Sequence, residues 1–124
     1  NEWCFASYDD VVLNLQRFGV VDIAKLVKGP VEKTLLEPNN LPNQISLLRL
    51  DTDWYDSTLV ELRVLYPLVS PGGVILINDY CHWEGARKAV DEFFCSLPSH
   101  EKPLMWITDR SGRGFIKPSH NYCK

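Results

Sequence analysis

Apolar residues recur along the chain at two spacings, one typical of helices and one typical of buried strands. Between residues 8 and 18 they fall every three or four positions, which predicts an amphipathic helix that Ser7 or Asp9 caps. The same helical spacing returns at residues 31–36, 57–69 and 83–97. Thr58 and Glu61 are expected to form a capping box at the start of the third of these four helices.

Short β-like runs, rich in apolar residues and bounded by turn residues, predict the strands. These runs are residues 24–27, 45–50 and 74–77. Near the C-terminus, residues 104–108 and 114–117 are expected to pair as an antiparallel hairpin. Residues 70–73 read Ser-Pro-Gly-Gly, a composition that predicts a turn between the third helix and the strand that follows it.

The order of these elements indicates the fold class. Strands alternate with helices until the final hairpin, and such alternation favours an α/β fold with a mainly parallel sheet. The hairpin then adds an antiparallel strand to that sheet. A chain of 124 residues is long enough to bury a sizeable core, so we expect one domain over residues 1–124.

Polar side chains follow two of the predicted strands at the point where each strand ends. Asp51 and Asp53 come after the strand at 45–50, and Asn78 and Asp79 follow the strand at 74–77. Ligands of open α/β sheets bind beyond the carboxyl ends of the strands, and neighbouring strands lie about 4.8 Å apart. If these two strands are neighbours, Asp51, Asn78 and Asp79 converge on one small site.

Oxygen ligands grouped in this way suit Mg²⁺, which would lower the pKa of a coordinated hydroxyl. Asp53 is then placed to accept the proton. The alternative is structural, since Asp and Asn are common after strands because they form turns and cap helices. The pattern of residues alone supports the two interpretations equally.

Three further residues lie beside these acidic loops. His82 follows the second loop, but a single loop histidine is more often solvated than functional. Trp54 and Trp83 flank the two loops and are candidates to line a pocket.

Composition and charge exclude several classes of protein. The net charge is −3 and no basic stripe is present, which argues against a nucleic-acid partner. The strongly apolar run at 74–77 is far too short to span a membrane. The four cysteines lie far apart and without metal-binding spacing, which favours reduced thiols in a cytoplasmic protein. They are Cys4, Cys81, Cys95 and Cys123.

Three segments resemble a known family, in order and at the family's spacing. Residues 48–58 read L-R-L-D-T-D-W-Y-D-S-T, and resemble the L-R-L-D-x-D-x-Y-x-S-T segment of macrocin-type O-methyltransferases. Residues 66–73 resemble their Y-P-x-x-x-P-G-G turn. Residues 78–93, N-D-Y followed by G-x-R-x-A-V-x-x-F, resemble their D-D-Y segment.

The resemblance implies a class I methyltransferase with a Rossmann-like sheet of strand order 3-2-1-4-5-7-6. The chain is similar to the C-terminal half of such a protein and lacks the first two strands with their glycine-rich loop. An exposed strand edge would then favour a homo-oligomer. The implied reaction moves a methyl group from S-adenosylmethionine to a hydroxyl of a sugar or other small natural product.

The resemblance also assigns site residues. It implies Mg²⁺ held by the three positions Asp51, Asn78 and Asp79, and a base at Asp53. The family usually has a carboxylate where this chain has Asn78, so the metal loses one charged ligand here. The residues that bind S-adenosylmethionine are not assigned, because the glycine-rich loop that normally does so is absent.

Two other functions stay open at this stage. The first is a non-catalytic methyltransferase-fold fragment or remnant, which the missing donor-site elements and Asn78 support. The second is a metal-dependent phosphotransferase or hydrolase that uses the paired acidic loops. The terminal hairpin and the order of the motifs speak against this second alternative.

Overall fold

The computed structural model describes residues 5–119. The chain divides into two compact units, residues 1–30 and residues 31–124. The prediction of one domain over residues 1–124 stays a prediction. In the described part of the chain, none of the helices has the length and apolar character that a membrane span requires.

The first unit consists of α1 (Tyr8–Arg17) and a 3₁₀ turn (Val21–Ile23). Ser7 is the N-cap of α1: its hydroxyl accepts the Asp10 backbone N–H, and the Asp10 carboxylate accepts the Ser7 backbone N–H. This reciprocal capping box satisfies two N–H groups that the helix leaves unpaired. Of the two residues expected to cap this helix, Ser7 is therefore the one that does.

The strand expected at residues 24–27 is absent, and this prediction was wrong. Ala24 has extended backbone angles, but no other strand pairs with this segment. Its apolar side chains instead line a small hollow against the start of α1, where the Lys28 ammonium lies 5.8 Å from the centre of the Tyr8 ring. Three of the four residues are apolar, but most of the segment is exposed, and a strand also needs a hydrogen-bonding neighbour.

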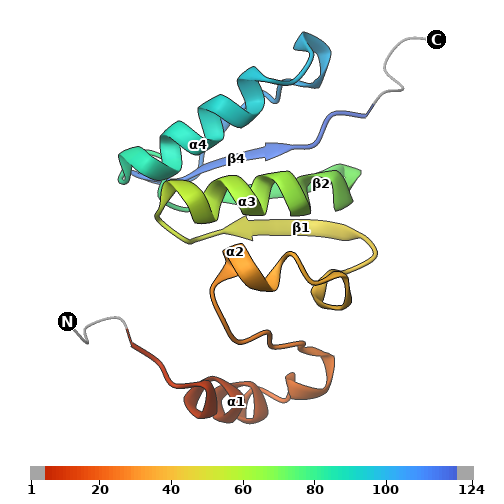
Figure 1. The fold of residues 1–124 in the computed structure, drawn as a ribbon, viewed down its shortest axis with the longest axis vertical. Coiled ribbons are helices and arrows are strands. Elements are labelled where there is room, and N and C mark those ends of the chain that lie inside the picture. Colours follow the sequence, from red (N-terminus) through yellow and green to blue (C-terminus); the bar gives the residue numbers. More distant parts are fainter. Residues whose placement is uncertain (1–4, 120–124) are drawn as a thin grey trace. The chain divides into compact units, whose positions relative to one another are not determined.

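The second unit carries the sheet. Its helices are α2 (Val31–Thr34), α3 (Tyr55–Leu65) and α4 (Glu84–Cys95), and its strands are β1 (Ile45–Leu50), β2 (Val69–Ile77), β3 (Trp106–Ile107) and β4 (Arg113–Ile116). Short 3₁₀ turns lie at Pro38–Asn40, Tyr66–Leu68 and Ser99–Glu101. Figure 1 shows β1, β2 and β4 side by side, with α3 and α4 crossing them.

The four strands follow the order β1-β2-β4-β3. This order corresponds to strands 4-5-7-6 of the expected class I sheet, and the terminal hairpin is confirmed because β3 and β4 pair antiparallel. The sheet is mixed, as the expected antiparallel strand requires: β1 and β2 are parallel, while β4 runs antiparallel to β2. Residues 24–27 add no strand to it. The expected absence of the first two strands stays a prediction.

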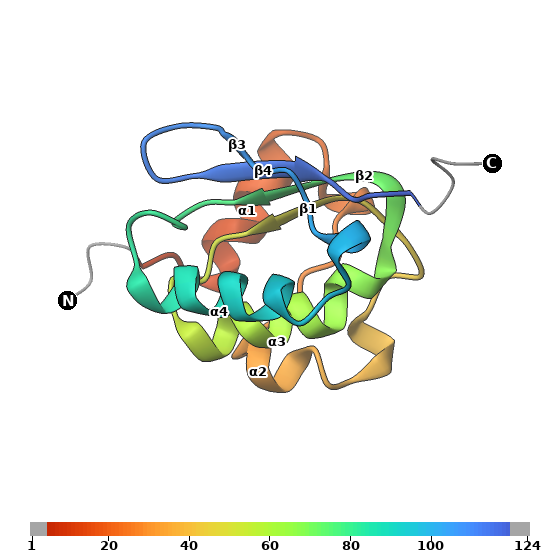
Figure 2. The same ribbon diagram turned by 90° about the horizontal axis from the view of Figure 1, so that it is seen from above.

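Both long helices of this unit, α3 and α4, cover the same face of the sheet (Figure 2). The strands turn their alternate residues toward them, so that Leu48, Leu50, Ile75, Ile77 and Phe115 are buried. Aromatic rings fill the space between sheet and helices. Phe94 of α4 meets Phe115 edge to face, with ring centres 5.1 Å apart. This core fixes α3 and α4, and with them the two loops that precede these helices.

The Ser-Pro-Gly-Gly segment is part of a strand rather than a free turn. β2 begins at Val69, and the pairing with β1 jumps from Ile45↔Val69 to Leu47↔Val74, so residues 70–73 form a bulge. β4 is the reason that the segment stays in the sheet. The Gly72 N–H donates to the Lys117 carbonyl at 3.0 Å, and the Lys117 N–H donates to the Gly73 carbonyl at 2.8 Å.

Replacing Gly72 by alanine is expected to lower the free energy of unfolding by about 1–2 kcal/mol, because the residue has a left-handed backbone with φ of +82°. A Cβ at this position meets no atom within 4 Å, so backbone strain alone causes the loss. Urea unfolding measures it. Gly72→Asn serves as the control and should lose less, since asparagine tolerates this conformation. A Gly72→Ala variant as stable as the parent would contradict the explanation.

Candidate active site

The ends of β1 and β2 bring the two acidic loops together. The strands are parallel, with Leu50 opposite Ile77. Beyond this pair, the Asn78 N–H donates to the Leu50 carbonyl at 2.9 Å. Both loops therefore leave the same edge of the sheet side by side, as the sequence predicted for neighbouring strands.

Three carboxylates meet at this edge. Oxygens of Asp51, Asp53 and Asp79 all lie within 4.8 Å of one another. The expected approach of Asp51 and Asp79 is confirmed, and Asp53 belongs to the same cluster. Asp51 is exposed, whereas Asp53 and Asp79 are half-buried.

A tight turn directs Asp53 into the cluster. The Trp54 N–H donates to the Thr52 carbonyl at 2.6 Å, which closes a three-residue turn around Asp53. Among the described residues other than glycine, Asp53 alone has a positive φ, at +62°. Backbone strain of this kind occurs often at functional sites, where the surrounding structure compensates for it.

The electrostatics of Asp53 follow from this crowding. Burial raises the pKa of the Asp53 carboxyl, and a hydrogen bond with Asp79 and the negative charges of Asp79 and Asp51 raise it further. The charge of His82 acts in the opposite direction. The cluster therefore favours either a proton on Asp53 or a cation among the three carboxylates.

Both the oxygen and the nitrogen of the Asn78 side-chain amide make hydrogen bonds beside the cluster. Its Oδ1 accepts a hydrogen bond from the Arg49 guanidinium at 2.8 Å, and its Nδ2 donates to Asp79 at 2.9 Å. The same guanidinium lies 2.7 Å from a carboxylate oxygen of Asp51. Arg49 thus holds Asp51 and Asn78 together and brings one positive charge to the site.

Sequence reasoning did not select Arg49 as a site residue. The available signal was a single charged side chain within an otherwise apolar strand, two positions before Asp51. Such a side chain has to leave the core, and the alternation of β1 turns Arg49 away from the face that buries Leu48 and Leu50.

The donor set fits a hard divalent cation. Mg²⁺ binds oxygen at about 2.1 Å in octahedral geometry, which separates its ligands by about 3 Å or about 4.2 Å. The three carboxylates lie within 4.8 Å of one another, so small side-chain rotations would bring them to these distances. The oxygen of Asn78 is a further candidate ligand, since an amide oxygen has two lone pairs and Arg49 occupies one of them.

Aromatic side chains border the cluster. The Asp79 carbonyl accepts the backbone N–H groups of His82 and Trp83 at 3.0 and 3.1 Å, which fixes that loop against the site. The Trp83 ring lies 5.8 Å from the Trp54 ring, centre to centre, and the His82 ring meets Trp83 edge to face at 4.8 Å. The expectation that the two tryptophans line a pocket stays a prediction.

Buried polar groups support the first loop from within. The Thr52 hydroxyl donates to Glu61 at 2.9 Å, and the Ser57 hydroxyl donates to the Thr52 carbonyl at 3.1 Å. The expected capping box of Thr58 and Glu61 was wrong: α3 begins at Tyr55, so Thr58 already lies inside the helix. Burial raises the pKa of Glu61 to about 7.

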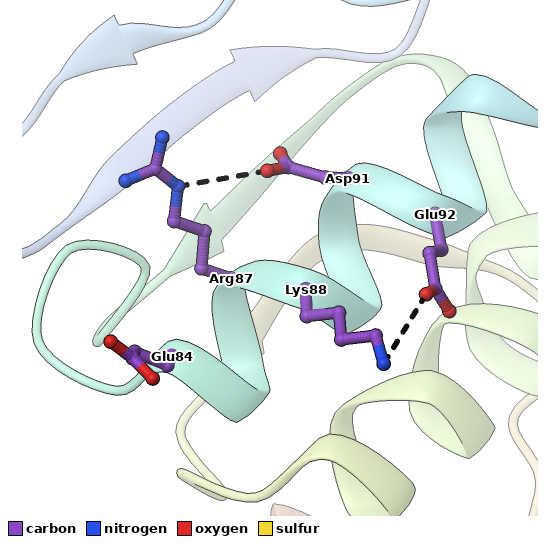
Figure 3. A pocket seen from close by; sticks show the side chains of 5 residues that line it. All are labelled: Glu84, Arg87, Lys88, Asp91 and Glu92. Carbon is purple, nitrogen blue, oxygen red and sulfur yellow. Dashed lines mark ion pairs between the residues drawn. The ribbon is translucent and has the colours of Figure 1, made fainter.

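The outer face of α4 carries charged side chains of both signs. Figure 3 shows that its charged side chains pair with one another along the helix, Arg87 with Asp91 and Lys88 with Glu92. The hydroxyl of Tyr80 donates to Asp91 at 2.6 Å. These ion pairs lie within the helix face, whereas in the carboxylate cluster Asp51, Asp53 and Asp79 share the single ion pair of Asp51 with Arg49.

Comparisons with known proteins identify the family of the chain. The family model for macrocin-O-methyltransferase (TylF) matches residues 1–112. The chain is 34% identical over 86 residues to 8-demethyl-8-(2,3-dimethoxy-alpha-L-rhamnosyl)-tetracenomycin-C 4'-O-methyltransferase of Streptomyces olivaceus, across 68% of this chain and 32% of the relative. It is 33% identical over 88 residues to demethyldecarbamoylnovobiocin O-methyltransferase of Streptomyces niveus, across 70% of this chain and 33% of the relative.

A solved structure shows the same fold. The O-methyltransferase NovP is similar with a TM-score of 0.78 and 27% identity, over 92% of this chain and 46% of NovP. The chain spans about a third of the length of the two curated relatives, at 32% and 33%. Its fold is thus that of an α/β methyltransferase, and the methyl donor that this kind of enzyme uses is S-adenosylmethionine. The chain belongs to the macrocin-O-methyltransferase (TylF) family.

Proposed function

We propose that this chain contributes the catalytic edge of an S-adenosylmethionine-dependent O-methyltransferase that acts on a hydroxyl of a sugar or other small natural product. The observation that carries the proposal is the cluster of Asp51, Asp53 and Asp79 beyond the ends of two parallel strands, in a chain of this family. The relative from Streptomyces olivaceus is a 4'-O-methyltransferase for a rhamnosyl-bearing tetracenomycin, which supports a sugar hydroxyl as acceptor.

Asp51, Asn78 and Asp79 hold Mg²⁺ in this proposal. Two of them contribute carboxylates, and Asn78 contributes its amide oxygen. The amide carries no charge, so the site neutralises less of the positive charge of Mg²⁺ than three carboxylate ligands would. An Mg²⁺ ion held by these residues would lower the pKa of the acceptor hydroxyl, and S-adenosylmethionine would supply the methyl group.

Asp53 is the base. Its pKa is raised by burial and by its acidic neighbours, which makes the ionised carboxylate a stronger proton acceptor than an ordinary aspartate. Asp53 takes the hydroxyl proton as the acceptor oxygen forms its bond to the methyl carbon and the bond from carbon to sulfur breaks. The tight turn at Thr52 and Trp54 holds the carboxylate in place for this transfer.

Several narrower predictions stay predictions: a homo-oligomer, the absence of a nucleic-acid partner and a cytoplasmic location. Because the chain belongs to the macrocin-O-methyltransferase family, we no longer propose a metal-dependent phosphotransferase or hydrolase. A non-catalytic remnant is not favoured, and the binding experiment below separates it from the proposed enzyme.

Replacing Asp79 by asparagine is expected to weaken Mg²⁺ binding by about tenfold or more, because the change removes one of two charged ligands. Isothermal titration of the chain with MgCl₂, and with S-adenosylmethionine with and without Mg²⁺, measures the effect. Asp56→Asn is the matched control, since Asp56 is an exposed carboxylate in the first turn of α3. Equal Mg²⁺ affinity in both variants would contradict the metal site, and a folded chain that binds neither ligand would indicate the remnant.

A further inference from the structure

Two tryptophans occupy the N-cap positions of both long helices in the second unit. Trp54 precedes α3 and Trp83 precedes α4, and neither makes a side-chain capping hydrogen bond. Ser, Thr, Asp and Asn are the favoured residues at this position, and a non-capping residue there costs about 0.5–2 kcal/mol. The chain forgoes this stabilisation twice at the same edge of the sheet, where both helices begin (Figure 1).

The two indoles are also more exposed than tryptophan side chains usually are. Trp54 is 67% exposed and Trp83 is 38% exposed. Neither belongs to the buried core beneath α3 and α4. Their rings lie 5.8 Å apart and are tilted by 34°, so together they present an apolar surface to solvent. Exposed aromatic surface of this kind often marks a binding site.

This surface adjoins the acidic cluster on both sides. Trp54 follows Asp53 directly, and the Trp83 N–H donates to the Asp79 carbonyl at 3.1 Å. The same two loops carry the indoles and the carboxylates, and a ligand of both would rest on the indoles with its edge at the carboxylates. Such a ligand needs one apolar face and hydroxyl groups at its rim.

We propose that Trp54 and Trp83 form a stacking surface for the sugar ring of the acceptor. One face of a pyranose presents C–H groups, which an aromatic face attracts because the quadrupole of the neutral ring makes its face electronegative. The hydroxyl groups lie around the rim of the ring, where Asp53 can accept a proton. This assignment rests on the proposed function, which requires an acceptor hydroxyl beside Asp53, and it adds the groups that orient the sugar.

Indole N–H signals in ¹⁵N NMR spectra test the stacking surface directly. We expect titration with methyl α-L-rhamnopyranoside to shift the signals of Trp54 and Trp83. Trp106 is the internal control, because it is 42% exposed but lies on the edge strand β3. Signals are assigned from single Trp→Phe variants. Equal shifts of Trp106, or no shift of the other two signals at saturation, would show that the surface is not a sugar site.

Substitution gives the second measurement. Trp54→Ala is expected to weaken rhamnoside binding by about threefold to tenfold, whereas Trp54→Phe keeps an aromatic face and should retain most of it. Unchanged binding by Trp54→Ala, in a variant whose spectrum shows a native fold, would overturn the proposal. Phenol is the competing probe: indole shifts with phenol but not with the rhamnoside would also overturn it, in favour of an aromatic ligand.

The outcomes for the sugar surface and for the proposed function can be told apart. Rhamnoside binding at the two tryptophans without methyl transfer would support the surface and count against the enzymatic role. Methyl transfer that needs Asp53 but has the same KM in Trp54→Ala and in the parent would support the enzyme and overturn the surface.

Discussion

Replacing Asp53 by asparagine is expected to lower kcat for methyl transfer by about 10²–10⁴-fold, the usual contribution of a positioned base. The variant keeps the backbone, because asparagine is among the few residues that tolerate the positive φ found at Asp53. It also keeps a side chain of nearly the same shape next to Asp79. The loss therefore reports the missing proton acceptor rather than a collapsed loop.

The stability of the same variant should change in the opposite direction. Burial and two neighbouring carboxylates raise the pKa of Asp53, so its ionised form is disfavoured in the folded chain near neutral pH. A neutral amide removes this repulsion, and the melting temperature of Asp53→Asn should equal or exceed that of the parent. A site kept for function at the expense of stability has this signature.

Release of S-adenosylhomocysteine by the protein that carries this sequence measures the rate, with a rhamnoside as acceptor. Asp56→Asn is the matched control, three residues along the chain and exposed in the first turn of α3. Its rate should stay within about twofold of the parent, since Asp56 lies outside the carboxylate cluster. An Asp53→Asn enzyme with the activity of Asp56→Asn would show that another group takes the proton.

The acidic site could be predicted from sequence because its geometry follows from strand order. Asp51 and Asp79 come directly after, or one residue after, apolar runs that pair as parallel neighbours, and such strands end at one edge. Asp53 is different. Its place in the cluster depends on a positive φ and a three-residue turn, and no spacing rule in the sequence encodes either of them.

Partners of the site residues were harder to predict than the residues themselves. The contact of Asn78 with Arg49 joins side chains 29 positions apart, one in the loop after β2 and the other on β1. Glu61 matched a helix-capping pattern, yet it accepts a hydrogen bond from Thr52 in the preceding loop because α3 begins before the expected start. In both cases the local sequence pattern identified the residue, but tertiary packing determines its hydrogen-bond partner.

The failures in the sheet have a related cause. Residues 24–27 and 70–73 were assigned from composition, as a strand and a turn. Strand identity depends on a neighbour: the first segment has none, while the second bonds to Lys117, the residue after β4, and forms a bulge within β2. Sequence patterns report burial and flexibility well, but hydrogen-bonded neighbours are a property of the assembled sheet.

Glu61→Gln should make the chain more stable above pH 7 by up to about 3 kcal/mol. The side chain of Glu61 is 7% exposed, and burial raises its pKa from 4.5 to about 7. The negative charges of Glu32 and Asp51 also raise this pKa, while the hydrogen bond from Thr52 lowers it. A shift of this size corresponds to about 3 kcal/mol, because each pKa unit is worth about 1.4 kcal/mol.

The direction of the pH dependence follows from proton uptake. Below pH 4.5 both the folded and the unfolded chain carry the proton, so Glu61 costs nothing. Between pH 4.5 and about 7 only the folded chain keeps it, and stability falls as the pH rises across this window. Above it the folded chain buries a charge. Glutamine removes this loss, yet its amide oxygen can still accept the Thr52 hydroxyl.

Urea unfolding of both proteins from pH 4 to pH 8.5 isolates the contribution of Glu61, because every other titrating group is common to the two. The difference in free energy of unfolding should be close to zero near pH 4.5 and should grow in favour of glutamine toward pH 7.5. Glu37→Gln, at an exposed glutamate before the Pro38–Asn40 turn, should show no such growth. A flat difference for Glu61→Gln would mean that Glu61 is ionised at ordinary pH. The loop between Asp51 and Asp53 would then be anchored by a charged group rather than by a protonated one.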